Sequence, residues 1–351
     1  MVWSPGEGLV ASYWSIVRTR VGGCQRGELW LFCDRGKRPD HVLYGDGPMD
    51  DVRRARVGVI GLGQMGLGMA KNLVKGGFDV TGFDPRAEAR EAFAAAGGAI
   101  AADNRTLVEQ CDVVLTSLTS PVYLEIVEEL LVPAARAGQV FVDASTIAAP
   151  RARAVFVALA ARNAHALDAP VTGGVAAAER GTLRMFVGGE RAVYDRCLPL
   201  LQAMCKPDGV SYGGAAGQGQ VMKVVQQLKN RITDAVRMEV IAFGMRAGLT
   251  VEQVRRALDV GADDGDPYAK LLTAIAWGRG DAIDVVFAEW GYYLEEAREK
   301  GIPMPALESM YEFCREGERV CRDGVGRMAP SVWRELFTKS GPALSEGDGT
   351  R

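Results

Sequence analysis

A glycine-rich turn, Gly61-Leu62-Gly63-Gln64-Met65-Gly66, begins where the short apolar run 57–60 ends, and a helical pattern follows it from Leu67 to Lys75. Between a strand and a helix, Gly61 would permit a tight turn, Gly63 a close approach of the backbone to a pyrophosphate, and Gly66 close packing of helix on strand. We therefore predict that this turn binds a dinucleotide. The predicted binding residues are Gly61, Leu62, Gly63, Gln64, Met65 and Gly66.

Asp84 stands at the end of the next predicted strand, 79–83. A carboxylate there can accept hydrogen bonds from the ribose hydroxyls and repel a 2′-phosphate, which favours NAD over NADP. Arg86 leaves NADP as an alternative cofactor, because an arginine just beyond the strand can pair with a phosphate.

Two consecutive glycines, Gly173 and Gly174, follow Thr172 in the segment 168–174. Their N–H groups, with the threonine hydroxyl, could converge on a substrate carboxylate. The alternative is an ordinary turn that ends a strand.

Lys223 lies one turn inside a largely apolar helical pattern that follows the glycine-rich segment 213–219. Burial disfavours a charged amine, so its pKa should fall toward the range useful for proton transfer. Gln226 and Gln227 share its face and could orient a substrate oxygen. The alternative is a lysine whose amine reaches solvent.

Composition excludes several other chemistries. With only two histidines, His41 and His165, neither a Ser-His-Asp set nor a histidine-based zinc helix is expected. The seven cysteines form no C-x-x-C pair, which indicates free thiols in a reducing, cytoplasmic compartment and no metal site. Forty-one basic against 44 acidic residues predict no nucleic-acid partner, and no apolar run is long enough to predict a membrane span.

Short β-branched runs alternate with helical patterns from Arg56 onward, which is typical of a parallel α/β sheet. We predict strands at 57–60, 79–83, 113–116, 140–143, 166–167 and 185–187. A long helix is predicted over 220–247, and shorter ones over 251–258 and 285–300.

The pattern thus predicts a parallel α/β region from Arg56, followed beyond Gly219 by a region that is helical throughout. Residues 1–55 show no sustained period and are predicted to form a poorly ordered extension, with a small capping element or a targeting sequence as alternatives. Residues 340–351 are predicted to be a tail.

Four segments of the chain together resemble the β-hydroxyacid dehydrogenase family, which contains 3-hydroxyisobutyrate dehydrogenase and tartronate semialdehyde (glyoxylate) reductases. The resemblance covers about residues 56–320 and rests on GLGQMGLGMAKNL at 61–73, VDAST at 142–146, LDAPVTGGVAAAERGTL at 167–183 and GQGQVMK at 217–223. It implies NAD(P)-dependent hydride transfer between nicotinamide and a small β-hydroxy acid or the matching semialdehyde acid. It also implies a doubly wound Rossmann domain over 56–218, then a long interdomain helix and an all-α C-terminal domain over 219–339, and a homodimer or homotetramer.

The resemblance further implies residue roles. Lys223 matches the catalytic lysine, and Thr172, Gly173 and Gly174 match the loop that holds the substrate carboxylate. Gln227 is placed at the substrate, while Leu118, Ser145 and Thr146 are placed near the nicotinamide.

Three departures from the family's usual residues affect which substrate is expected. Gln226 and Gln227 stand where the family usually has two asparagines, Ala288 and Glu289 stand where it has a Lys-Asp pair, and Ala177 stands where glycine is common. These departures leave two alternatives open, which are an imine-reductase-like enzyme and a non-catalytic nucleotide-binding interaction module. The retained Lys223 argues against both.

Overall fold

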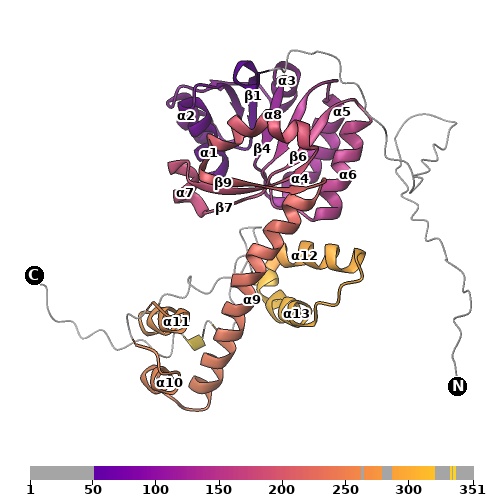
Figure 1. The fold of residues 1–351 in the computed structure, drawn as a ribbon. Coiled ribbons are helices and arrows are strands. Elements are labelled where there is room, and N and C mark those ends of the chain that lie inside the picture. The colour runs from indigo at the N-terminus through magenta and orange to yellow at the C-terminus, as the bar shows by residue number, and fades with distance from the viewer. Residues whose placement is uncertain (1–50, 262–264, 279–286, 321–332, 334, 337–351) are drawn as a thin grey trace, which may run out of the picture. The chain divides into compact units, whose positions relative to one another are not determined.

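The structure is a computed structural model that describes residues 51–261, 265–278, 287–320, 333 and 335–336 (Figure 1). Of the predicted N-terminal extension, only residues 51–55 are described. There the short 3-10 helix η1 (Val52–Arg54) places Val52 in the core, and Ala55 is buried beside it. The predicted tail lies outside the described residues.

A nine-stranded, mostly parallel sheet carries the first part of the described chain, in the order β3-β2-β1-β4-β5-β6-β8-β7 with β9 paired to β8. The strands are β1 (Arg56–Ile60), β2 (Asp79–Phe83), β3 (Ala99–Ile100), β4 (Val113–Thr116), β5 (Val140–Asp143), β6 (His165–Asp168), β7 (Val171–Thr172), β8 (Leu183–Gly189) and β9 (Cys205–Gly214). The strand order reverses direction at β1 and β4, which is the point where doubly wound sheets bind dinucleotides.

Helices cover both faces of this sheet. Alternation along the strands sends Val57 and Val59 to one core and Ile60 to the other. The first core is closed by α1 (Gln64–Lys75), α2 (Ala87–Ala94), α7 (Gly174–Arg180) and α8 (Arg191–Gln202). The second is closed by α3 (Asn104–Gln110), the short helix α4 (Ser120–Tyr123), the π-helical segment η2 (Leu124–Leu131), α5 (Val132–Ala134) and α6 (Ala149–Ala160).

The far edge of the sheet differs from the purely parallel arrangement that the sequence predicted. Strand β8 pairs antiparallel with both β6 and β7, whereas β8 and β9 are parallel. The reason is connection length, because the seven-residue α7 only reverses the chain direction, while the twelve-residue α8 is long enough for a crossover.

Helix α9 (Gln218–Arg246) has 29 residues and passes from the sheet into a second, helical core. At 1.5 Å per residue it is about 43 Å long. Its partners are α10 (Val251–Ala257), α11 (Pro267–Ala276), α12 (Phe287–Glu299) and α13 (Pro305–Val320), coloured orange to yellow in Figure 1. Ion pairs from Arg153 of α6 to Glu296 and Glu299 of α12, at 2.8 and 2.7 Å, join the helical core to the sheet.

The predicted fold class is confirmed, with the predicted strands and the long helix within a few residues of their expected bounds. The short strands β3 and β7 and the ten-residue β9 were not predicted, because two-residue strands and glycine-containing segments carry little periodicity. The domain boundaries stay predictions. None of the helices in the described part of the chain has the length and apolar run needed to cross a lipid bilayer.

Candidate active site

The turn between β1 and α1 has the geometry expected of a phosphate-binding loop. Gly61 has a φ of +91°, and a side chain on Gly66 would collide with the carbonyl of Gly61. A Cβ on Gly63 would meet nothing closer than an Arg86 nitrogen at 3.6 Å, so the backbone at Gly63 is open to a ligand. No side chain caps the start of α1, which leaves its first N–H groups available to an anion.

Asp84 lies buried at the carboxyl end of β2, beside this turn. Its carboxylate accepts hydrogen bonds from the Leu62 amide at 2.9 Å and from the Arg86 guanidinium at 2.8 and 2.9 Å. Burial acts to raise the pKa of Asp84, but the hydrogen bonds from Arg86 and Leu62 outweigh it and lower the pKa. The predicted ribose ligand is therefore ionised and already paired with Arg86.

The loops after β4 and β5 meet the start of α9. The amide of Leu118 donates to the Ser145 hydroxyl at 3.0 Å, and the buried Gln220 side chain donates to the Ser145 carbonyl at 2.9 Å. Thr146 is partly exposed between them. The structure thus brings the three predicted nicotinamide neighbours together and adds Gln220, which the sequence analysis missed although it lies inside the quoted segment 217–223.

Thr172, Gly173 and Gly174 lie where β7 passes into α7. Gly173 and Gly174 have φ values of +138° and +74°, and both are exposed. A side chain on Gly173 would come within 2.7 Å of the Ala177 Cβ, so this turn requires glycine. The glycine amides at the start of α7 are accessible, as a carboxylate-binding turn requires.

Lys223 is 5% exposed and donates a hydrogen bond to the carbonyl oxygen of Val171 at 2.8 Å. Its amine therefore lies beside the strand that ends in Thr172. Burial lowers the pKa of Lys223, the negative charge of Glu289 partly restores it, and the positive charge of Arg231 lowers it further. The alternative of an amine that reaches solvent is wrong.

Asp168 fixes the start of α9. Its carboxylate accepts hydrogen bonds from the amides of Gly217 at 2.7 Å and Gln220 at 2.9 Å. A side chain on Gly219 would come within 2.6 Å of the Asp168 carbonyl oxygen, so the helix lies against β6 without a gap. Burial and the charge of Asp143 raise the pKa of Asp168 to about 6, although both amide bonds oppose the rise.

Polar side chains continue along α9 and α12. The hydroxyl of Tyr293 donates to Glu289 at 3.0 Å, and Glu289 interacts electrostatically with Lys223. Gln227 is partly buried one turn after Lys223. The side-chain carbonyl oxygen of its neighbour Gln226 is buried and accepts no hydrogen bond within the described part of the chain.

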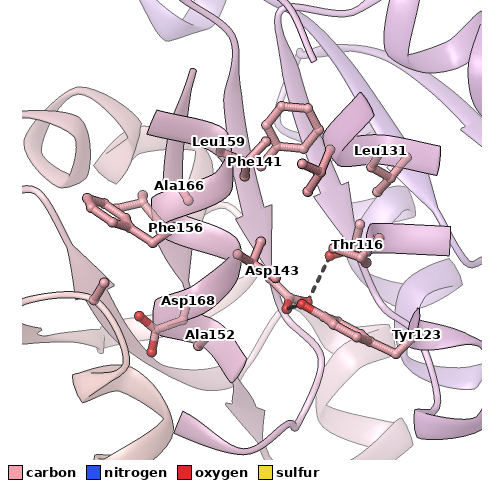
Figure 2. A pocket seen from close by; sticks show the side chains of 15 residues that line it. Thr116, Tyr123, Leu131, Phe141, Asp143, Ala152, Phe156, Leu159, Ala166 and Asp168 are labelled. Atoms are coloured by element: carbon pink, nitrogen blue, oxygen red, sulfur yellow. Dashed lines mark hydrogen bonds between the residues drawn. The ribbon is translucent and has the colours of Figure 1, made fainter. Parts of the chain in front are cut away.

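A small cavity of about 30 Å³ lies between the sheet and helix α6, and Figure 2 shows Asp143 and Asp168 at one end of it. Asp143 accepts hydrogen bonds from Thr116 at 2.8 Å and Tyr123 at 2.7 Å. A space of this size holds one or two waters. It is too small for a dinucleotide or an organic acid, so we assign the candidate active site to the residues gathered around Lys223 instead.

Comparison with known proteins agrees with this geometry. A family model described as the NAD binding domain of 6-phosphogluconate dehydrogenase matches residues 56–225. The 2-(hydroxymethyl)glutarate dehydrogenase of Eubacterium barkeri is 31% identical over 306 residues, which cover 83% of this chain and 98% of that protein. The L-threonate dehydrogenase of Cupriavidus necator is 31% identical over 267 residues, or 73% of this chain and 88% of that protein.

A solved structure of Mycobacterium tuberculosis 3-hydroxyisobutyrate dehydrogenase with L-serine has a TM-score of 0.64 at 26% identity, and covers 81% of this chain and 99% of that one. The chain therefore belongs to the β-hydroxyacid dehydrogenase family, whose members are NAD(P)-dependent oxidoreductases. Its cofactor is NAD or NADP. The resemblance seen in the sequence is confirmed at the level of family, enzyme class and cofactor.

Proposed function

We propose that this enzyme transfers a hydride between NAD and the hydroxyl-bearing carbon of a small β-hydroxy acid, with Lys223 as the general acid and base. The observation that carries this proposal is the position of the Lys223 amine, which is buried and bonded to the Val171 carbonyl next to the Thr172-Gly173-Gly174 turn. A substrate carboxylate on that turn would bring the adjacent hydroxyl-bearing carbon to the lysine.

The nicotinamide, when bound, accepts or supplies the hydride. In the oxidative direction, neutral Lys223 takes the proton of the substrate hydroxyl. In the reductive direction, protonated Lys223 donates a proton to the carbonyl oxygen. A lowered pKa suits both roles because the buried amine gives up its proton more readily than an exposed lysine does.

Other residues around Lys223 hold and orient the substrate and the cofactor. The N–H groups of Gly173 and Gly174 and the hydroxyl of Thr172 bind the carboxylate, and Gln227 orients the substrate from the next turn of α9. Gln220 ties the Ser145 loop to α9, so the cofactor loops and Lys223 keep a fixed separation. The turn 61–66 holds the pyrophosphate.

The test compares the wild type with Lys223→Met in a nicotinamide absorbance assay, using NAD and NADP with 3-hydroxyisobutyrate, L-serine and 2-(hydroxymethyl)glutarate. We expect turnover by the wild type and a fall in kcat of about 100-fold or more in the variant. NADH binding, followed by fluorescence, should be unchanged. Equal rates in the two proteins would overturn the assigned role of Lys223.

Two further proposals concern the whole protein. The buried free thiols of Cys111, Cys197, Cys205 and Cys314 support a reducing, cytoplasmic compartment. Exposed apolar side chains on α9, namely Val236, Val240 and Phe243, support a homo-oligomer in which a second copy covers them.

A further inference from the structure

Helix α9 carries a polar stripe in which Lys223, Gln227 and Arg231 follow one another at four-residue spacing. The neighbouring stripe of Val224, Leu228 and Ile232 packs into the helical core. The polar stripe thus runs along the edge of the core, from the proposed proton-transfer group toward the C-terminal helices.

Arg231 is partly buried and makes no hydrogen bond or ion pair in the described part of the chain. It nevertheless lies close enough to act on its neighbours, because its charge lowers the pKa of Lys223 and of Tyr293. Among the described residues, the buried side-chain atoms without a partner include no Arg231 nitrogen, so its guanidinium reaches solvent and its N–H groups are free to bind an anion.

The charges around Arg231 leave room for an anion. The protonated Lys223 and Arg231 contribute two positive charges, and Glu289 is the acidic group that acts on Lys223 and Tyr293. Glu289 also accepts the hydroxyl hydrogen bond of Tyr293, which holds it on α12. With Lys223 protonated the cluster has an excess of one positive charge, and with Lys223 neutral the charges of Arg231 and Glu289 balance, so Arg231 is then the one positive group of the three.

The proposed carboxylate turn and Arg231 are both linked to Lys223, the first through Val171 and the second along α9. The Thr172-Gly173-Gly174 turn adjoins Lys223 through Val171. Arg231 lies two turns further along α9, about 12 Å along the axis, and helical side chains lean back toward the N-terminus. An organic acid held at the turn would thus direct its far end along the stripe toward Arg231.

We propose that Arg231 is a specificity-determining residue that binds a second carboxylate of the substrate, so that the preferred substrates are β-hydroxy dicarboxylic acids. This inference rests on the proposed function, since it assumes that the first carboxylate binds at Thr172-Gly173-Gly174. The planar guanidinium matches a carboxylate in a two-point hydrogen bond.

The test uses three compounds with the same reacting group, a hydroxymethyl next to a carboxylate. They are 2-(hydroxymethyl)glutarate, its methyl ester at the far carboxyl, and 3-hydroxyisobutyrate. The wild type should use the dicarboxylate with a kcat/KM about 30-fold above that of the ester. This comparison needs no variant, so it does not depend on the folding of a mutant.

Arg231→Met should abolish that preference, mainly through a higher KM for the dicarboxylate, and should leave kcat/KM for 3-hydroxyisobutyrate within threefold. Arg231→Lys should keep part of the preference. The matched control is Lys229→Met, which removes a positive charge from an exposed position of the same helix and should behave as wild type.

Equal kcat/KM for the dicarboxylate and its ester, with the same ratio in Arg231→Met, would overturn this inference and leave the proposed function standing. Absence of turnover of all three compounds, in protein that binds NADH, would overturn the proposed function and this inference with it. A dicarboxylate preference that Lys229→Met also removes would show a general charge effect and overturn the assignment to Arg231.

Discussion

Asp84 and Arg86 define the chemistry at the adenosine end of the cofactor site. The Asp84 carboxylate accepts from the backbone amides of Leu62 and Arg86 and twice from the Arg86 guanidinium. A ribose hydroxyl that donates to Asp84 must compete with Arg86, whose side chain is 59% exposed and would be available to pair with a 2′-phosphate. Cofactor choice therefore depends on this pair and not on Asp84 alone.

Replacing Arg86 should shift that choice toward NAD. We expect Arg86→Ala to leave kcat/KM for NAD within threefold, because Asp84 becomes free to accept ribose hydroxyls, and to lower kcat/KM for NADP by about tenfold or more. Steady-state kinetics with both cofactors measures the ratio. A variant with an unchanged ratio would contradict the role of Arg86.

The pH dependence of oxidation should report Lys223. Because the neutral amine takes the hydroxyl proton, kcat/KM should rise with pH through a pKa below the ordinary lysine value of 10.5. Glu289 favours the charged amine, so Glu289→Gln should move this rise to lower pH. Glu239→Gln, at an exposed position of α9, is the control and should leave the profile in place. A shift to higher pH in Glu289→Gln would refute this assignment.

At the scale of elements, the junction of β6 and α9 determines where Lys223 lies. Asp168 accepts two amide hydrogen bonds from the first residues of α9, and Gln220 bonds both sides of the Ser145-Ile147 loop. A helix of 29 residues anchored at its first turn transmits any tilt to its whole length. We therefore expect the buried Asp168 carboxylate to affect catalysis by positioning the helix.

Asp168→Asn should destabilise the protein by about 1–3 kcal/mol near pH 7.5, because an amide nitrogen would face a backbone N–H donor. In the wild type the pKa of Asp168 is about 6 when folded, above the value of 3.8 for an unperturbed aspartate. Between these values the folded state binds more protons, so this group makes stability fall as pH rises from about 4 to 6.

The variant should lose that component of the pH dependence, which urea unfolding at several pH values measures. Asp195→Asn, on an exposed ion pair of α8, serves as the control. An unchanged pH slope in Asp168→Asn would show that another group is responsible.

At the scale of the whole molecule, apolar surface is left uncovered on the second half of α9. Phe243 is 79% exposed although it is large and apolar, and Val236 and Val240 lie on the preceding turns. Contiguous apolar surface of this kind marks an interface. It supports the proposed homo-oligomer, in which α9 of one chain would pack on a second copy.

Phe243→Glu should therefore dissociate the oligomer, because it places a charge in an apolar interface. Size-exclusion chromatography with light scattering measures the mass of each species. Val157→Glu introduces the same charge at an isolated exposed apolar position on α6 and should not change the mass. A wild type that runs as a monomer would contradict the proposal.

The sequence by itself determined the family, the Rossmann fold and the dinucleotide turn, since each depends on local pattern. The glycine spacing at 61–66 is recognisable in the sequence because Gly61 needs a positive φ and Gly66 lies against the Gly61 carbonyl, although Ser117 of a distant loop also lies against both glycines. The alternation of β-branched and helical segments likewise predicts the parallel part of the sheet, but not its antiparallel edge at β8.

Only the tertiary structure decided how the polar groups are paired. The pairing of Arg86 with Asp84 depends on side-chain direction. The amide hydrogen bonds to Asp168 and the proximity of Glu289 to Lys223 join distant segments of the chain. Arg231 acts on Lys223 from the same helix, which again depends on side-chain direction. Burial of Lys223 also depends on packing against β7, which a two-residue strand does not reveal in the sequence. Electrostatic interactions act through space and weaken with solvation, so their partners and strengths become defined only when the chain has folded.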